Sequence, residues 1–170
     1  MVEAVLAMRK ICKDSSGLSS VGLANVWVGR ALQNAIRCSL APRQRLRCLD
    51  MSETLVVNEI YLSLQGESTF AGLPCVFVRL TACDLRCSYC DTAYAFTEGK
   101  KRALSEVCAE VRQLAKPYSD FGLQTSDFRL PLVELTGGEP LLQKNSLPLM
   151  QQLCDDGFTV LLETSGAHDI

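Results

Sequence analysis

Three cysteines lie close together in the middle of the chain. Cys83, Cys87 and Cys90 form a C-x3-C-x2-C pattern in the segment "CDLRCSYC". Thiolates are soft ligands, so three of them on one short loop favour zinc or an iron-sulfur cluster over magnesium or calcium. Structural zinc needs a fourth cysteine or histidine, and the single histidine, His168, is far away in the sequence. Three cysteines without an obvious fourth ligand favour a four-iron cluster with one iron open to a substrate or cofactor.

Two other interpretations of this pattern stay open, a zinc-stabilised binding module and thiols that only pack in a loop. The other cysteines form no second closely spaced pair; they are Cys12, Cys38, Cys48, Cys75, Cys108 and Cys154. The total of nine is odd, and the first residues lack the ordered regions of a signal peptide. We therefore expect a reduced, cytoplasmic setting rather than a secreted disulfide framework.

Two more polar segments follow apolar, strand-like runs. "TGGEP" follows "PLVEL", and "ETSG" closes "FTVLL". In parallel α/β folds, sites gather at the carboxyl ends of strands, so the three segments form one candidate site. Gly137 and Gly138 are expected to let a ligand approach the backbone and to leave N–H groups free for it, and Glu139 can accept from an ammonium or a hydroxyl.

The elements that position these segments follow from residue patterns. Runs of β-branched, aromatic and apolar residues predict strands over residues 55–64, 75–81, 131–136 and 158–164. Apolar residues at helical spacing predict helices over residues 102–116 and from about 146 to 157. This alternation predicts an α/β fold with a mostly parallel sheet. Cys108 and Cys154 are expected on the apolar faces of the two helices.

The first fifty residues differ in composition from the rest. They hold eight Lys/Arg and three Asp/Glu, whereas residues 51–170 hold nine and sixteen. They contain one plausible amphipathic helix at about residues 21–37, and their arginine content is typical of transit peptides, although an extension without function is the favoured interpretation. We place a boundary at residue 51. No apolar run is long enough to span a membrane, and the net charge of -2 predicts no general affinity for nucleic acid.

The chain stops soon after the apolar run "FTVLLE". A strand that is apolar on both faces needs a neighbour and covering helices, so we expect residues 51–170 to be the first part of a larger domain. The N-terminal segment is not expected to cover this strand, because its periodicity is helical and its arginines are costly to bury.

The three segments resemble a known family. The cysteine pattern with Tyr89 before its last cysteine, followed by "TGGEP", is similar to the radical S-adenosylmethionine superfamily. More narrowly, "LSLQGESTFAGLPCVFVRLTACDLRCSYCDTAYAF", "LVELTGGEPLLQ" and "VLLETSGA" resemble the 7-carboxy-7-deazaguanine synthase family over about residues 55–170. The resemblance implies a partial (βα) barrel of the radical S-adenosylmethionine type. A glycyl-radical-enzyme activase is the nearest alternative, since it shares the cysteines and "GGEP" but not "LQGES" or "CDTAYAF".

The resemblance also implies cofactors and their ligands. Cys83, Cys87 and Cys90 would hold a 4Fe-4S cluster, and Thr92 in "CDT" would bind Mg²⁺. The residues implied near S-adenosylmethionine are Tyr89, Asp91, Gly137, Gly138, Glu139 and Ser165.

In this family the substrate is 6-carboxy-5,6,7,8-tetrahydropterin and the product is 7-carboxy-7-deazaguanine, a precursor in queuosine biosynthesis. The positions implied to bind the pterin are Leu64, Gln65, Gly66, Arg79 and Thr136, and no residue is assigned as catalytic. A guanidinium such as that of Arg79 pairs well with a substrate carboxylate. The resemblance further implies an electron donor such as flavodoxin and a homodimer of the whole protein. This chain departs from the family at Ala82 and Ser68, where glycine is usual or frequent, and both departures bear on local turn geometry.

Overall fold

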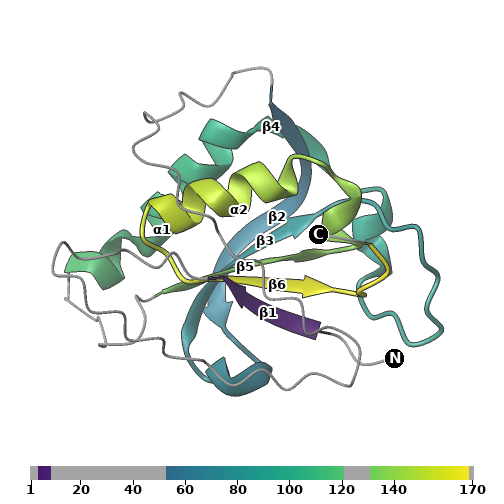
Figure 1. The fold of residues 1–170 in the computed structure, drawn as a ribbon, viewed down its shortest axis with the longest axis horizontal. Helices are drawn as coiled ribbons and strands as arrows, with labels where there is room; N and C mark the ends of the chain where they lie inside the picture. Colours follow the sequence, from purple (N-terminus) through teal and green to yellow (C-terminus); the bar gives the residue numbers. More distant parts are fainter. Residues whose placement is uncertain (1–3, 9–52, 121–130, 169–170) are drawn as a thin grey trace, which may run out of the picture.

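The structure is a computed structural model that describes residues 4–8, 53–120 and 131–168. The helix predicted at residues 21–37 lies outside the described residues. In the described part, six strands form one sheet in the order β1-β6-β5-β3-β2-β4 (Figure 1). The strands are β1 (Ala4–Met8), β2 (Thr54–Leu64), β3 (Pro74–Leu80), β4 (Lys100–Ala103), β5 (Leu132–Gly137) and β6 (Val160–Thr164). Two helices accompany them, α1 (Leu104–Asp120) and α2 (Ser146–Asp155).

The sheet is mixed, which corrects the expectation of a mostly parallel sheet. Strands β3, β5 and β6 are parallel to one another, whereas β2 is antiparallel to both β3 and β4, and β1 is antiparallel to β6. The reason lies in the connections: only residues 65–73 join β2 to β3, and a parallel pair needs a crossover of roughly a dozen residues or more. The longer connections through α1 and α2 join the parallel strands.

Both helices cover the same face of the sheet (Figure 1). The expected apolar positions of α1 are buried there, including Cys108, and they pack with Leu149, Leu153 and Cys154 of α2. Alternate strand residues such as Val78 and Leu135 complete this core. We call this side of the sheet the helix face. None of the helices in the described part is long and apolar enough to cross a membrane.

The opposite side of the sheet, which we call the open face, becomes polar toward the carboxyl ends of the parallel strands. A small apolar cluster of Cys75, Leu132 and Leu161 lies at the other end. An irregularity in β2 between Val57 and Glu59 shifts the alternation of this strand. Ile60 and Leu62 therefore pack on the helix face. The residues of β2 that alternate with these two lie on the open face and are polar.

Strand β1 corrects the expectation about the N-terminal segment. Ala4–Met8 pair antiparallel with β6, with Ala4 opposite Thr164 and Met8 opposite Val160. An exposed strand edge presents unpaired N–H and C=O groups that any short extended segment can satisfy. The run "AVLAM" is apolar and uncharged, so the cost of burying arginine does not arise for these five residues.

Candidate active site

The ends of three adjacent parallel strands bring the three polar segments together. Strand β3 ends at Leu80, β5 at Gly137 and β6 at Thr164, and the register pairs Leu80 with Gly137. Beyond β6, His168 Nε2 lies 3.0 Å from Asp84 Oδ2 in the cysteine loop. The predicted convergence of "CDLRCSYC", "TGGEP" and "ETSG" on one edge is therefore present in the structure.

The two glycines of "TGGEP" allow two backbone segments to approach closely. A Cβ at Gly137, whose φ is +124°, would stand 2.1 Å from the Leu80 carbonyl oxygen, and a Cβ at Gly138 would stand 2.1 Å from that of Ala82. The N–H of Gly138 donates to Leu80 O at 3.2 Å and the N–H of Glu139 donates to Ala82 O at 2.9 Å. The glycines thus permit the turn to pack on the start of the cysteine loop, and these N–H groups are used within the protein.

Glu139 is the centre of this strand-end junction. It is fully buried, and its carboxylate accepts from the Thr164 hydroxyl, the Ser165 hydroxyl, the Ser165 N–H and the Leu141 N–H at 2.6–3.0 Å. Burial alone would raise the pKa of Glu139, but the bonds from Ser165, Leu141 and Thr164 outweigh it and lower the pKa. The hydroxyls from which Glu139 accepts belong to "ETSG", whereas the expected bond from a ligand stays a prediction.

Cys83, Cys87 and Cys90 are free and half-buried. The loop is held by Arg86, whose Nη1 donates to Cys83 O at 2.8 Å and whose guanidinium lies 4.4 Å from the centre of the Phe96 ring. Among the described residues, no three Cys, His, Asp or Glu side chains are arranged to hold a metal ion. The donor set nevertheless fits a soft metal or cluster, since it consists of three accessible free thiols on one loop.

The other residues implied near a cofactor lie around this loop. Tyr89 is 59% exposed and Asp91 is exposed, so both side chains remain open to a ligand. Thr92 is half-buried, with its Oγ1 3.9 Å from Cys90 Sγ. Ser165 is held by Glu139 at the end of β6.

Arg79 lies on the open face in a set of polar contacts. Its Nε donates to Glu59 Oε1 at 2.9 Å and its Nη2 donates to Tyr61 Oη at 3.0 Å. Tyr94 Oη also donates to Glu59 Oε1, at 3.1 Å. Burial opposes the charge of Arg79, but the hydrogen bonds with Glu59 and Tyr61 raise its pKa above the ordinary value. This guanidinium is therefore fixed in place and charged.

The remaining predicted substrate residues divide into two groups. Leu64 and Gly66 are exposed at the end of β2. Gln65 is 4% exposed, and its carboxamide is used inside the protein, because its Oε1 accepts from the Glu67 N–H at 3.1 Å and its Nε2 donates to Glu134. Thr136 is buried and its hydroxyl donates to Glu163.

Three residues of this face were missed by the sequence reasoning, Glu59, Tyr61 and Glu134. Each of them lies within a run that was interpreted only as an apolar strand. Glu163 was included only as the first residue of "ETSG". For the two glutamates a signal was available, because an acidic residue inside an apolar run is rarely buried without partners.

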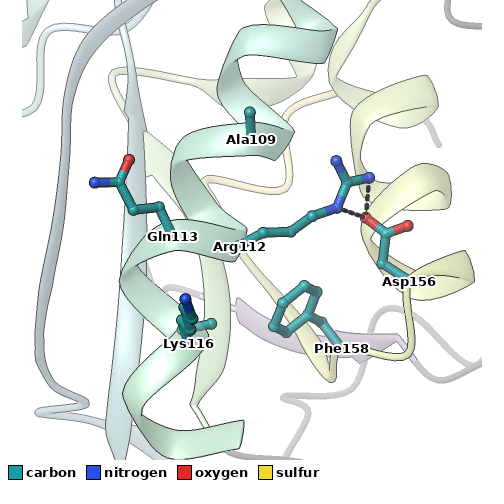
Figure 2. Close-up of a pocket in the computed structure, with 7 residues that line it drawn as sticks. Ala109, Arg112, Gln113, Lys116, Asp156 and Phe158 are labelled. Atoms are coloured by element: carbon teal, nitrogen blue, oxygen red, sulfur yellow. Dashed lines mark hydrogen bonds and ion pairs between the residues drawn. The ribbon is translucent and has the colours of Figure 1, made fainter. Parts of the chain in front are cut away.

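An open hollow lies on the other side of the molecule, between α1 and the turn after α2 (Figure 2). Arg112 crosses it and donates from Nε and Nη2 to Asp156 Oδ2 at 2.9 and 2.5 Å. Ala109, Gln113, Lys116 and Phe158 line it as well. The hollow belongs to the helix layer, so it is separate from the strand ends that carry the candidate site.

The chain is similar to curated proteins that share one name. No family model matches it. It is 50% identical over 115 residues to the 7-carboxy-7-deazaguanine synthase of Koribacter versatilis, covering 67% of this chain and 45% of that protein. It is 32% identical over 126 residues to the synthase of the same name from Escherichia coli K12, covering 67% and 54%.

A solved structure agrees with this. The crystal structure of QueE from Escherichia coli matches with a TM-score of 0.55 and 26% identity, covering 69% of this chain and 55% of that one. The chain spans about half the length of the curated relatives it matches.

Proposed function

Because the chain belongs to the 7-carboxy-7-deazaguanine synthase family, we propose that it carries the cluster-binding and pterin-binding part of a radical S-adenosylmethionine enzyme. This enzyme would convert 6-carboxy-5,6,7,8-tetrahydropterin to 7-carboxy-7-deazaguanine, with ring contraction and loss of ammonia. We further propose that residues 51–170 are the first part of a (βα) barrel of the radical S-adenosylmethionine type, with residues 1–50 as an extension.

One observation supports this proposal more than any other. The cysteine loop, the Gly-Gly turn and "ETSG" are joined at one sheet edge through backbone bonds from Gly138 and Glu139 and through the bonds that Glu139 accepts from Thr164 and Ser165. Three soft ligands thus lie beside a rigid, hydrogen-bonded platform. Such a platform suits a cofactor that bridges the loop and the strand ends.

The residues that would hold the cluster are Cys83, Cys87 and Cys90. When bound, a 4Fe-4S cluster with S-adenosylmethionine supplies a carbon radical that removes a hydrogen atom from the substrate. In the proposal, Tyr89, Asp91, Ser165 and the Gly137–Glu139 turn surround the S-adenosylmethionine, and Thr92 supplies a hydroxyl oxygen to Mg²⁺, a hard cation that prefers oxygen ligands. The ionised Glu139 carboxylate accepts hydrogen bonds from the Ser165 N–H and hydroxyl and so keeps both in position.

The open face would bind the pterin. Arg79, fixed by Glu59 and Tyr61, would pair with the pterin carboxylate. Thr136 and the chain at Leu64, Gln65 and Gly66 would contact the ring. The Gln65 side chain is occupied by Glu67 and Glu134, and its backbone N–H donates to Leu73 O. Its contribution to binding would therefore come from its carbonyl oxygen, which accepts from the Gly72 N–H and has a second lone pair. An electron donor such as flavodoxin, a cytoplasmic location and a homodimer of the whole protein complete the proposal.

The first experiment is anaerobic reconstitution with iron and sulfide. We expect visible iron-sulfur absorption that is abolished in Cys87→Ala and retained in Cys108→Ala, since Cys108 is buried among helix residues. Metal analysis separates this outcome from a zinc module. Equal absorption in the two variants, or zinc in place of iron and sulfide, would contradict the cluster.

The second experiment tests the substrate. The reconstituted protein, with S-adenosylmethionine, Mg²⁺ and a chemical reductant, is incubated with the carboxypterin, and the deazaguanine is measured by mass spectrometry. A peptide with an intact glycine, of the kind that a glycyl-radical-enzyme activase would oxidise, serves as the control substrate and should not react. Binding of the pterin, measured by calorimetry, should weaken in Arg79→Lys, because an ammonium cannot pair bidentately with a carboxylate. Unchanged affinity would remove Arg79 from the site.

A further inference from the structure

The open face holds a carboxyl group that the proposed cofactor and substrate contacts do not use. Glu134 lies in the middle of β5 and is 3% exposed. In the sheet it stands between Phe77 of β3 and Leu161 of β6. A carboxylate is costly to bury beside two apolar neighbours unless it is paired or protonated. The state of this group therefore depends on its hydrogen-bond partners.

Those partners come from two other elements. Gln65 Nε2 donates to Glu134 Oε2. Glu134 is paired with Leu161, so Glu163, two residues further along β6, points to the same face of the sheet. Two ionised carboxylates side by side on one face repel each other, which favours a proton on one of the two. Glu134 is the deeper group, whereas Glu163 is half-buried and accepts a bond from the Thr136 hydroxyl. The geometry assigns the proton to Glu134.

Electrostatics agree with this assignment. Burial raises the pKa of Glu134 to about 8, with the charge of Glu163 as the next cause, and the bond from Gln65 acts in the opposite direction. The other titratable groups that face it are Glu67 in the loop after β2 and the Cys75 thiol on β3. Burial raises the pKa of Cys75 above its ordinary value, so this thiol is neutral. Arg79 on β3 is committed to Glu59.

We propose that Glu134 is a neutral carboxylic acid at neutral pH that donates a hydrogen bond to Glu163 and thereby positions both Glu163 and the Gln65 loop. In this proposal the bond from Glu134 to Glu163 extends a chain of observed contacts, in which Gln65 Nε2 donates to Glu134 and Gln65 Oε1 accepts from the Glu67 N–H. Glu134 is a positioning residue. The effect of Glu134 on pterin binding rests on the proposed function, whereas the protonation of Glu134 does not.

The protonation state of Glu134 is tested on the full chain without cofactors. The protein is labelled with ¹³C at glutamate carboxyl carbons, and their chemical shifts are followed with pH by NMR. We expect one carboxyl to titrate with a midpoint near 8, against about 4.3 for an ordinary glutamate. Glu134→Gln should remove that signal. Glu163→Gln should lower the midpoint, because it removes the neighbouring charge, and Glu67→Gln, an exposed residue of the same loop, should change it little.

Two results would overturn the assignment. One is that every glutamate titrates in the ordinary range; the other is that the high midpoint persists in Glu134→Gln. The glutamine keeps the shape of the residue and can donate to Glu163 while it accepts from Gln65, so this variant is expected to fold.

The positioning role is tested by pterin binding to the reconstituted protein at several pH values. If only the protonated form of Glu134 is competent, the dissociation constant of the wild-type protein should rise about tenfold between pH 7 and 9. Glu134→Gln should bind as at pH 7 across this range, and Glu134→Val should bind weakly throughout. A Glu134→Val protein that binds as tightly as wild type would overturn the role. If no variant binds the pterin but one carboxyl still titrates near 8, the proposed function fails and the protonated Glu134 stands.

Discussion

Two glutamates, five residues apart, are buried in the same part of the chain with opposite consequences. Glu134 in the middle of β5 and Glu139 just beyond its end are 3% and 0% exposed. The pKa of Glu134 is raised to about 8 and that of Glu139 is lowered. Equal burial therefore does not decide the charge of a carboxyl group.

The difference lies in what each carboxyl meets. Glu139 accepts from four donor groups on Thr164, Ser165 and Leu141, so its charge is compensated. Glu134 meets one amide donor and a second carboxyl, Glu163, so its charge is opposed. The strand-end junction therefore needs Glu139 as an ionised carboxylate, whereas Glu134 on the open face can stay protonated.

The largest effect should come from neutralising the junction. Glu139→Gln places an amide NH₂ against donors of Ser165 or Thr164, which leaves buried groups without acceptors. We expect a loss of about 3 kcal/mol in the free energy of unfolding, measured by denaturant unfolding at pH 7. Glu134→Gln should instead be at least as stable as wild type at pH 7, because its neighbours already meet a neutral group and the variant lacks the stability that the raised pKa of Glu134 costs at this pH. Equal losses in the two variants would break the comparison.

The close approach of the turn to the cysteine loop gives the next effect. In Gly138→Ala the new methyl would stand 2.1 Å from Ala82 O, and relieving this overlap should cost about 2–3 kcal/mol. The matched control is Gly66→Ala on the open loop, where a Cβ meets nothing within 4 Å. Thermal unfolding of both variants measures the difference, and a Gly138→Ala protein as stable as the control would show that the turn does not pack this tightly.

The pH dependence of stability separates the two glutamates by sign. Glu139 has a lowered pKa, so its stabilisation is present above its ordinary value of 4.5 and is lost as the pH falls below it. Glu134 has a raised pKa, so the folded protein binds more protons than the unfolded one between 4.5 and about 8, and its contribution declines as the pH rises through this window.

Removing one donor should move only the acid side of this profile. Ser165→Ala takes away the hydroxyl bond to Glu139, so it should raise the pKa of Glu139, shift the acid transition to higher pH and cost about 1 kcal/mol at pH 7. Glu134→Gln should instead flatten the decline between pH 4.5 and 8. Unfolding midpoints measured across the pH range test both, and a shift of the alkaline side by Ser165→Ala would contradict the separation.

The smallest expected effect is a gain in stability. Ala82 and Ser68 have φ values of 81° and 62°, in the left-handed region that disfavours a side chain with Cβ. Ala82→Gly should therefore stabilise the protein by about 0.5–1 kcal/mol. Ala109→Gly on the exposed side of α1 should instead destabilise it by about 1 kcal/mol. Calorimetric unfolding of the two variants gives the comparison, and losses in both would exclude strain at Ala82.

Much of the fold could be predicted from local pattern. The apolar spacing of α1 and the extent of α2 are confirmed, as are the four strands from Thr54–Leu64 to Val160–Thr164. The departures from the family at Ala82 and Ser68 coincide with the two non-glycine residues of positive φ in the described part. Each of these properties depends on residues close together in sequence, so it could be predicted from the sequence alone.

Other features depend on which segments meet. The short strand β4 was not predicted, because "KKRA" has no strand pattern. It forms because the edge of β2 is available to pair with it. The N-terminal segment was not expected to cover the strand that became β6, and this expectation was wrong for a similar reason: Ala4–Met8 pair with β6, because backbone groups of a strand edge do not select a distant partner by its side chains.

The sequence by itself determined the strands, the helices and the three chemical segments, and the order of strands and helices placed those segments at strand ends. Only the tertiary structure decided what the buried polar groups do. The N–H groups of Gly138 and Glu139 are taken by Leu80 and Ala82, and Gln65 is taken by Glu134 and Glu67. Glu134 and Glu139 are the same residue type at nearly the same burial, and their charges differ because hydrogen-bond donors and neighbouring charges come from other strands.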